Sequence, residues 1–485
     1  MMIVPRNVFT TLLVMLQLAA AVLGFTNRLA NMRVEDVPES VIDSGVLNNT
    51  VVFGYAYAQG IDAAAIPWDT LTHLILAFFH IDAGGNVVSG AGDVTPVVDA
   101  AHKHNVRVLA SIGGSGDPSA ILANVLSSNT TRATLVSSLT NTVDKYGLDG
   151  IDYDFEFPNS GQQINDLYLA LRGQRQSFDA KFGTAKKVLT MTLYSTDGKF
   201  GPSAPKVSAK QFSDTVDYGL LMAYDYFGNW ADTSAPNAPF YDIPGYPGLS
   251  FTSAISAWLD AGWSADRLVA GLPFYGRTAI VSSSTGTQFM PNSKAAPPGG
   301  PVSKIDGAWT WLDLRDPADG ALSDATTARN GWVRTWDNTT MTPWLLHNVS
   351  KTYIGYDDQE SLSIKTHHIL EKGLAGAFIW ILSYDHEGEL GAVVDEYTAA
   401  CRRLAKVSAE DQSSAEDQSS AEDKSSSELD EESSSEGGGK HSSSHGSKGS
   451  SSSHDGSQSN SAFHASVSAL LTVGCLLLQL LAVLG

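Results

Sequence analysis

The sequence Asp149-Gly150-Ile151-Asp152-Tyr153-Asp154-Phe155-Glu156-Phe157-Pro158 alternates apolar and acidic residues from Ile151 onward. Successive side chains of a β-strand point to opposite faces, so Asp152, Asp154 and Glu156 are predicted to share one face and the three aromatic residues the other. Three carboxyl groups on one buried face cannot all ionise cheaply, because each charge raises the pKa of its neighbours. At least one is expected to stay protonated near neutral pH and to be available as a general acid.

Two other interpretations of this segment fit less well. A calcium-binding loop would have glycine where Phe157 stands, and its ligands would come from a flexible loop. A solvated acidic edge strand would not carry large apolar residues on both flanks. The pattern therefore favours an acidic site on a buried strand.

Short apolar runs alternate with longer amphipathic stretches on both sides of this strand. The runs are mostly continuous and rich in Val, Ile, Leu, Phe and Tyr, as expected for strands buried on both faces of a parallel sheet. The eight predicted strands are Val51–Tyr57, Leu71–Phe79, Val106–Ile112, Leu148–Glu156, Val188–Tyr194, Gly219–Tyr224, Leu268–Tyr275 and Leu374–Leu382. Predicted helices between them include Val94–His104, Ala120–Tyr146, Ile164–Phe182 and Glu360–Lys372.

Eight strand and helix units predict an α/β fold, closed as a (β/α)8 TIM barrel. An open doubly wound sheet is the alternative, although no Gly-x-Gly-x-x-Gly turn follows the first strand. One connection is too long for a simple loop: residues 278–352, between the seventh strand and its following helix, have mixed character. We interpret them as a small α+β insertion domain within a catalytic barrel made of residues 51–277 and 353–403.

The charge and the cysteines limit the kind of protein. The formal net charge of −21 argues against a nucleic-acid partner, because such binding depends on Lys and Arg neutralising phosphates. Much of this excess lies between Glu410 and Glu436, where Lys424 is the only basic residue. The two cysteines, Cys401 and Cys475, exclude a disulfide scaffold, so stability must come from a hydrophobic core.

The N-terminal region has the pattern of a secretory signal peptide. Arg6 precedes an apolar run and a small residue at Gly24, so residues 1–24 are predicted to be the signal and residues 25–50 a lead-in to the barrel. A retained membrane anchor is the alternative, but the run is shorter than the roughly 20 residues that span a bilayer. The glycosylation sequons at Asn48, Asn129, Asn338 and Asn348 give this interpretation weak support.

The C-terminal region predicts a spacer followed by a lipid-anchor signal. Residues 404–460 contain a repeated acidic hexamer and a Ser-, Gly- and His-rich tract that cannot bury apolar area, so we expect a disordered spacer. Residues 461–485 end in an uncharged apolar tail without the Lys or Arg expected after a spanning helix, which is the alternative. The pattern is typical of a GPI-anchor signal. We therefore expect a secreted protein attached to the outer face of the plasma membrane or the cell wall.

The acidic segment resembles the Asp-x-x-Asp-x-Asp-x-Glu signature of family 18 chitinases, matched at Asp149, Asp152, Asp154 and Glu156. Trp380 stands where the family's last strand supplies a platform tryptophan. Other family motifs are resembled in order by Ser111-Ile112-Gly113-Gly114, Met222-Ala223-Tyr224-Asp225, Gly271-Leu272-Pro273-Phe274-Tyr275-Gly276-Arg277 and Tyr356-Asp357-Asp358. The resemblance implies a monomeric TIM-barrel hydrolase of β-1,4-linked N-acetylglucosamine polymers such as chitin, with no metal or cofactor.

The resemblance also implies roles for single residues. Glu156 would protonate the leaving oxygen while the acetamido oxygen of the substrate attacks its own anomeric carbon, a substrate-assisted route. Asp154 would orient the acetamide, Asp152 would share a proton behind it, and Tyr224 would donate a hydrogen bond to the acetamido oxygen. Trp380 is expected to form the floor beneath the reacting sugar. The other expected substrate-binding residues are Tyr55, Phe78, Gly114, Met222, Asp225 and Arg277.

Some positions depart from the family pattern. Ser115 stands where a tryptophan often follows the Gly-Gly pair, which removes a stacking surface on the leaving-group side, and Phe155 replaces a common tryptophan. These departures concern the substrate preference and not the residues that carry out the reaction. A lectin-like protein that binds chitin without hydrolysis is one alternative, although such relatives typically lack the glutamate that Glu156 supplies. An endo-β-N-acetylglucosaminidase acting on N-glycans is another.

Overall fold

The computed structural model describes residues 29, 32–88, 92–195, 208–283 and 286–409, which fall in one compact unit. The predicted signal peptide, most of the predicted spacer and the predicted anchor signal lie outside the described residues. Within the described part, none of the helices combines the length and the apolar character needed to cross a membrane.

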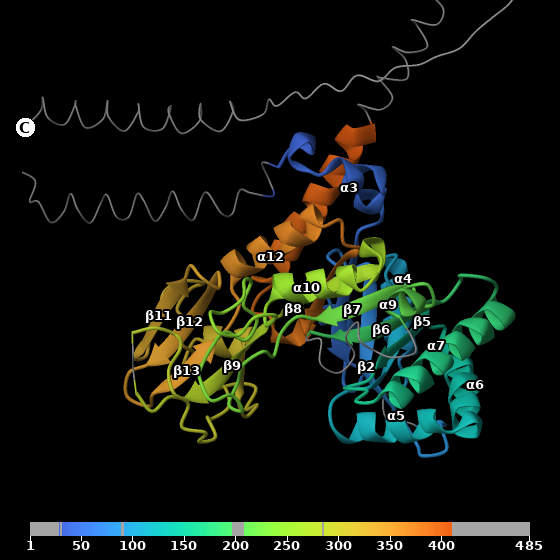
Figure 1. Cartoon of the computed structure of the whole chain (residues 1–485), viewed down its shortest axis with the longest axis horizontal. Helices are drawn as coiled ribbons and strands as arrows, with labels where there is room; N and C mark the ends of the chain where they lie inside the picture. Colours follow the sequence, from blue (N-terminus) through green and yellow to red (C-terminus); the bar gives the residue numbers. More distant parts are fainter. Residues whose placement is uncertain (1–28, 30–31, 89–91, 196–207, 284–285, 410–485) are drawn as a thin grey trace, which may run out of the picture. The chain divides into compact units, whose positions relative to one another are not determined.

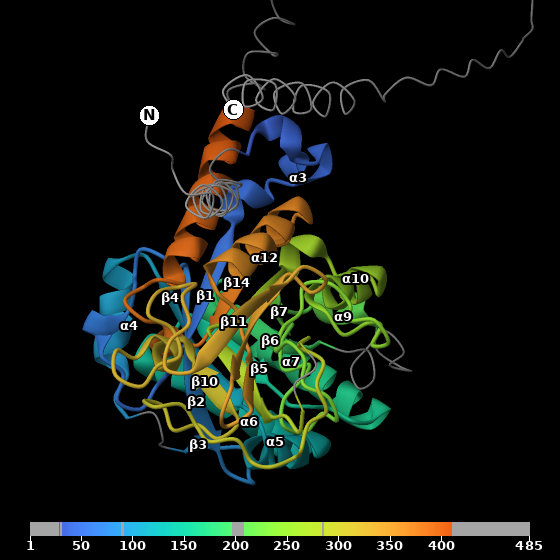
Figure 2. The same cartoon turned by 90° about the vertical axis from the view of Figure 1, so that its left-hand side faces the viewer.

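Eight parallel strands of the described chain close into a ring (Figure 2). Their order is β1-β14-β8-β7-β6-β5-β4-β2, and β1 also pairs with β2, which completes the circle. The strands are β1 Val51–Tyr57, β2 His73–Ile81, β4 Arg107–Gly113, β5 Gly150–Asp154, β6 Val188–Tyr194, β7 Tyr218–Met222, β8 Leu268–Pro273 and β14 Gly376–Trp380; β3 Val87–Val88 adds antiparallel to β2. The predicted TIM barrel is confirmed.

Helices connect the strands around the outside of the ring (Figure 1). They are α4 Thr95–Lys103, α5 Asp117–Ser127, α6 Asn129–Tyr146, α7 Gly161–Phe182, α9 Ala209–Ser213, α10 Phe251–Asp260 and α12 Gln359–Glu371, and α3 Glu39–Asp43 precedes β1. Short 3-10 helices are η1 Val34–Asp36, η2 Val46–Asn49, η3 Ala63–Ala65, η4 Ala265–Arg267 and η5 Leu382–Tyr384. A last helix covers residues 391–409, so the boundary that we expected at residue 404 falls inside it, where Leu404 is buried.

The prediction of one helix over Ala120–Tyr146 is wrong. Ser128 has an extended backbone, with φ −108° and ψ 132°, and separates α5 from α6. α5 starts earlier than expected, at Asp117, with a proline in its first turn, a position that needs no amide hydrogen. The residues at the break, Ser127, Ser128 and Asn129, favour caps and turns over helix interiors.

A second sheet stands beside the barrel (Figure 1). Its five antiparallel strands have the order β10-β9-β13-β12-β11. They are β9 Tyr275–Ile280, β10 Ala308–Thr310, β11 Trp332–Asp337, β12 Thr342–His347 and β13 Thr352–Gly355, with α11 Trp311–Arg315 after β10. The sheet begins three positions before Thr278, where we expected the insertion to start, because β9 follows β8 almost directly.

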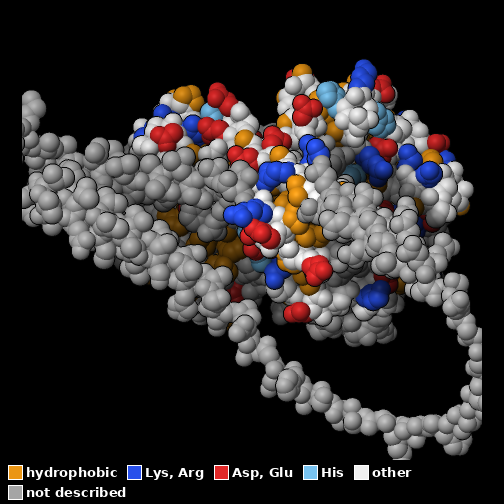
Figure 3. All heavy atoms as spheres, turned by 90° about the horizontal axis from the view of Figure 1, so that it is seen from above, with side chains coloured by type: hydrophobic (Ala, Val, Ile, Leu, Met, Phe, Trp, Pro, Cys, Tyr) orange, Lys and Arg blue, Asp and Glu red, His pale blue; other side chains and the backbone are white. Residues whose placement is uncertain are grey.

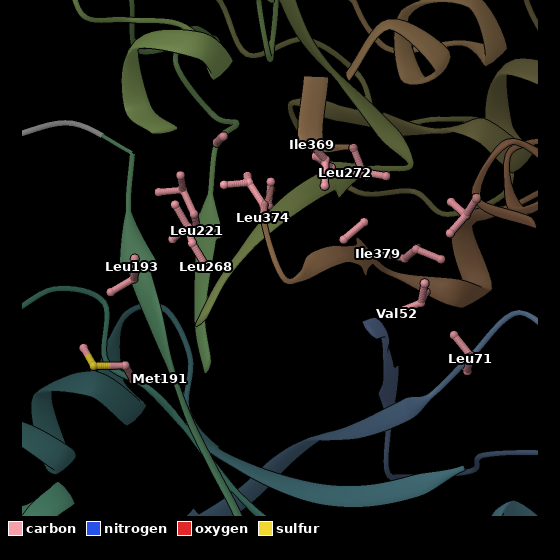
Figure 4. Close-up of a cluster of buried hydrophobic side chains, with 14 of the residues drawn as sticks. Val52, Leu71, Met191, Leu193, Leu221, Leu268, Leu272, Ile369, Leu374 and Ile379 are labelled. Carbon is pink, nitrogen blue, oxygen red and sulfur yellow. The ribbon is translucent and has the colours of Figure 1, made fainter. Parts of the chain in front are cut away.

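Apolar side chains pack on both sides of the barrel strands. Neighbouring residues alternate between the two: Phe53 points into the ring with Tyr55, whereas Val52 packs outward against helices. Figure 4 shows part of the outer layer, in which Val52 and Ile379 of two adjacent strands lie close together and Leu272 lies beside Ile369. On the molecular face seen in Figure 3, acidic and basic side chains are interspersed.

Candidate active site

The acidic segment forms β5 and the turn that follows it. Asp152 and Asp154 lie inside the barrel, with exposed fractions of 0% and 2%. β5 ends at Asp154, and Glu156 follows at the carboxyl end of the strand, where its side chain is half-buried. In TIM barrels this end of the strands carries the active site. Asp149 lies at the other end of β5, where its Oδ2 accepts a hydrogen bond from the backbone N–H of Val108 at 2.8 Å.

A cavity of about 600 Å³ opens over these carboxyl groups. Its volume is within the range of about 300–1,000 Å³ that is common for small-molecule sites. The cavity brings together eight of the predicted site residues: Tyr55, Asp154, Glu156, Met222, Tyr224, Asp225, Arg277 and Trp380.

Asp152 lies beneath the cavity wall and is held by three hydroxyl groups. Its Oδ2 accepts hydrogen bonds from Tyr55 at 2.9 Å and from Ser111 at 2.7 Å, and its Oδ1 accepts one from Thr190 at 2.6 Å. Burial raises the pKa of Asp152, while these three hydrogen bonds oppose the shift. Asp152 is thus a buried acid, and both of its carboxyl oxygens accept hydrogen bonds from the protein.

Asp154 is the middle carboxyl of the three. Its Oδ1 accepts a hydrogen bond from Thr192 at 2.8 Å, and its carboxyl group is hydrogen-bonded to that of Glu156. Burial, followed by the charges of Glu156 and Asp152, raises its pKa well above the ordinary value. Two carboxyl groups in contact share a proton in this way, because both cannot ionise at low cost.

Glu156 has a pKa suited to proton transfer near neutral pH. Burial raises the pKa to about 7, and the charge of Asp225 adds to the shift, whereas Arg277 and the hydrogen bond from Asp154 oppose it. The backbone N–H of Glu156 donates to Ser119 Oγ of α5 at 2.8 Å, which fixes the main chain of the turn. A general acid works best when its pKa lies near the operating pH.

Asp225 and Arg277 form an ion pair in the cavity wall. Arg277 Nε donates to Asp225 Oδ1 at 2.7 Å, Arg277 Nη2 donates to Asp225 Oδ2, and the Tyr275 hydroxyl donates to Oδ1 at 2.6 Å. We expected both charged residues to contact sugar directly. The structure places them in the wall, but both oxygens of Asp225 are already engaged within the protein.

Aromatic rings form much of the remaining wall. Trp380, the last residue of β14, lies with its ring centroid 5.1 Å from that of Tyr55. Tyr224 follows β7, and its ring contacts those of Tyr275 and Phe378 at their edges. Burial raises the pKa of Tyr224 well above its ordinary value, so its hydroxyl keeps its proton and can donate a hydrogen bond.

Phe78 and Gly114 are not part of the cavity lining. The Phe78 ring lies 6.2 Å from that of Trp380, and a Cβ added to Gly114 would come within 3.0 Å of the Phe78 ring. These two residues therefore pack against each other next to the platform, outside the lining of the cavity.

The sequence did not lead us to several residues of the lining. Trp230 and Tyr57 stand at the cavity with exposed fractions of 55% and 46%, and Phe157, Tyr194 and Tyr384 also line it. Phe157 was placed on the face opposite the carboxyl groups, which is wrong because strand alternation ends with β5 at Asp154. The cluster of aromatic residues that begins at Tyr226 and includes Trp230 could have indicated that Trp230 belongs to the site. In the described part of the chain, no group of three or more His, Cys, Asp or Glu residues could hold a metal ion.

Comparison with known proteins identifies the family. Residues 50–385 match the model of "Glycosyl hydrolases family 18". Chitinase A1 of Niallia circulans is 30% identical over 308 residues, which make up 59% of this chain and 42% of that relative. A class V chitinase of Arabidopsis thaliana is 26% identical over 69% of the chain and 87% of the relative.

The solved structures agree. The crystal structure of the chitinase RmChi1 from Rhizomucor miehei is similar at a TM-score of 0.63, with 25% identity over 72% of this chain and 99% of that one. Because the family model covers most of the chain and includes every residue of the cavity lining, the chain belongs to the glycosyl hydrolases of family 18.

Proposed function

We propose that the chain hydrolyses β-1,4-linked N-acetylglucosamine polymers such as chitin. The observation that carries this proposal is the contact between the Asp154 and Glu156 carboxyl groups at the floor of an open cavity, with the pKa of Glu156 raised to about 7. An acid with this pKa is partly protonated at neutral pH and can donate a proton to a glycosidic oxygen. The chitinases among the relatives support the choice of substrate.

In the first step, Glu156 gives its proton to the glycosidic oxygen as the bond to the anomeric carbon breaks, and the leaving sugar departs with that proton. The acetamido oxygen of the reacting sugar forms the new bond to the same carbon. Asp154 accepts a hydrogen bond from the acetamide N–H and balances the positive charge of the ring that forms. Tyr224 donates to the acetamido oxygen, for which its protonated hydroxyl is suited.

In the second step, ionised Glu156 takes a proton from water. The oxygen of that water attacks the anomeric carbon from the side that the leaving group vacated, and the bond to the acetamido oxygen breaks. Two displacements at one carbon retain its configuration. Retaining enzymes of other families use a second carboxylate as the nucleophile. Here the neighbouring carboxyl group, that of Asp154, is hydrogen-bonded to Glu156.

The test is a product profile on defined N-acetylglucosamine oligomers with wild type and Glu156→Gln. We expect the wild type to release shorter oligomers that first appear in the β configuration, and the variant to lose about 10²–10⁴-fold in turnover. Tight binding of oligomers without any hydrolysis by the folded wild type would instead select a lectin-like function. Release of glycans from a glycoprotein, with chitin left intact, would select an endo-acting enzyme of N-glycans.

The location that we propose is the outer face of the plasma membrane or the cell wall, reached through a signal peptide and held by a GPI lipid. The composition of residues 1–24 and 461–485 supports it, with residues 410–460 as a spacer. Treatment of intact cells with a phosphatidylinositol-specific phospholipase C should release the protein. Protein that stays bound after this treatment, while a known GPI-anchored marker is released, would contradict the anchor.

A further inference from the structure

A second cavity, of about 380 Å³, lies on the small five-stranded sheet. Strands β9 to β13 all contribute to it, together with three connecting segments. It is lined mainly by Trp309, Trp332, His347, Pro298, Asp319 and Asn330.

This cavity is separate from the active site because the two lie on opposite faces of the same strands. In β10, Ala308 lines the active-site cavity and the next residue, Trp309, lines the second one. In β9, Arg277 faces the active site, whereas Ile280 lines the second cavity. Neighbouring residues of a strand point to opposite faces, so β9 and β10 form a wall shared by the two cavities.

The wall of the second cavity is aromatic. The Trp309 and Trp332 rings lie 5.3 Å apart at 65°, and the His347 ring lies 5.2 Å from that of Trp332. Trp309 is anchored, with 7% of its surface exposed and its indole N–H donating to the Pro298 carbonyl at 3.4 Å. Trp332 is only half-buried and thus presents part of its ring to the cavity.

Polar groups around these rings have hydrogen-bonding capacity left over. Asn330 Nδ2 donates to the Gly320 carbonyl at 2.9 Å, which orients the amide and leaves Oδ1 as an acceptor. The backbone N–H of Ser350 donates to His347 Nδ1 at 3.1 Å, so a neutral imidazole carries its hydrogen on Nε2 and can donate. Asp319 is exposed and makes no side-chain hydrogen bond with the described residues.

We propose that this cavity is a second saccharide site, which holds one end of an N-acetylglucosamine chain outside the active site. The apolar C–H face of a pyranose stacks on an indole ring, while its hydroxyl groups need acceptors such as Asp319 and Asn330 and donors such as His347. Sites of this size with apolar walls and a few polar groups at fixed positions are typical of small-ligand binding. The choice of N-acetylglucosamine rests on the proposed function; the choice of a saccharide rests on the cavity itself.

The same sugar could come from two sources. One is the polymer on which the enzyme acts, and binding it here would keep the enzyme on an insoluble surface. The other is an N-linked glycan on Asn348, which lies directly after His347 and two positions before Ser350, both of which line the cavity. Asn348 is exposed, and its backbone N–H donates to the Gly331 carbonyl at 3.2 Å, beside Asn330 and Trp332.

The test counts binding sites on the protein carrying Glu156→Gln, made in a host that adds no N-glycans. Titration with the trimer of N-acetylglucosamine, followed by calorimetry, should reveal two sites. Adding Trp332→Ala should weaken one of them at least tenfold, and Asp319→Ala should weaken the same site without disturbing the aromatic wall. The matched control is Trp230→Ala, which should weaken the other site, because Trp230 lines the active-site cavity.

The outcomes separate this inference from the proposed function. A single site that Trp230→Ala weakens and that neither Trp332→Ala nor Asp319→Ala changes would overturn the inference and leave the proposed function standing. A single site that Trp332→Ala and Asp319→Ala weaken, and that Trp230→Ala leaves unchanged, would keep the inference and count against the active-site assignment. Protein from a glycosylating host decides the source: a second site that appears only after enzymatic removal of N-glycans is occupied by the protein's own sugar.

Discussion

Arg277 Nε lies 2.7 Å from Asp225 Oδ1, and the ion pair formed by these two side chains stands in the same cavity wall as Glu156. The two charges act on Glu156 in opposite directions, since Asp225 raises its pKa and Arg277 lowers it. Burial remains the largest cause of the raised pKa. The pair therefore adjusts the pKa of Glu156, whereas the burial of Glu156 in the barrel has the larger effect on it.

Removing the charge of Asp225 and removing that of Arg277 should shift the pH profile of activity in opposite directions. Activity requires protonated Glu156, so kcat/KM of the wild type should fall as the pH rises through about 7. Asp225→Asn should shift this fall to lower pH by about 0.5–1 unit, and Arg277→Gln should shift it to higher pH by a similar amount. Profiles of kcat/KM between pH 4 and 9 measure both shifts. Movement of both variants in the same direction would show that the pair does not act through charge.

Glu156→Gln should stabilise the protein at alkaline pH. The pKa of Glu156 is about 7 in the folded protein against an ordinary value of 4.5, so the unfolded state loses its proton first as the pH rises. Folded wild type consequently loses stability between these two values, and a glutamine does not. We expect the variant to gain on the order of 1–3 kcal/mol at pH 8 and little at pH 4.5, as measured by urea denaturation. A gain independent of pH would contradict this origin.

Ser119→Ala should impair turnover more than binding. The backbone N–H of Glu156 loses its acceptor, which costs about 1 kcal/mol of stability and loosens the turn that carries the acid. We expect kcat to fall about three- to tenfold with KM nearly unchanged. Ser127→Ala is the matched control, because this exposed serine of the same helix donates only to the Asn124 carbonyl. Equal kinetics for both variants would mean that the Ser119 bond does not position Glu156.

Gly113→Ala should destabilise the barrel beside the acidic strand. Gly113 has a φ of +101°, and a Cβ there would lie 2.0 Å from the backbone oxygen of Asp154. Gly116 has a φ of +75° with no atom within 4 Å of such a Cβ, so Gly116→Ala isolates the backbone strain. Thermal unfolding should show a loss of about 1 kcal/mol for Gly116→Ala and at least about 2 kcal/mol more for Gly113→Ala. Similar losses would argue against the close approach of β4 and β5.

The sequence predicted the barrel well because its strands are buried on both faces. Val51–Tyr57 and Val188–Tyr194 match β1 and β6 at both ends, and other strands differ by a few residues. The sequence predicted the ends of helices and strands less well where contacts between distant parts of the chain determine them. The break at Ser128 interrupts a stretch that has helical character on both sides, and β9 begins at Tyr275 because it pairs with β10 and β13, which lie far along the chain.

The candidate site was predictable to the extent that it follows strand alternation. Asp152 and Asp154 lie where this periodicity placed them. Beyond the strand ends no periodicity applies, and Trp230 was therefore missed. Tyr57 ends β1 on the same face as Tyr55, so strand alternation could have found it. The partner of Asp225 could not be deduced either, because Arg277 is 52 positions away in another strand and only the closed barrel brings the two together.

The ring closes through β1, which is hydrogen-bonded to β2 on one side and to β14 on the other. Tyr57 and Tyr384, 327 positions apart, come within 3.5 Å of each other across this seam. During synthesis on the ribosome, the acidic turn is translated long before the strand that completes the wall opposite it. A chain that ends short of β14 lacks both Trp380 and one of the two strands that flank β1, so neither the closed ring nor the tryptophan platform can form before β14 has been made.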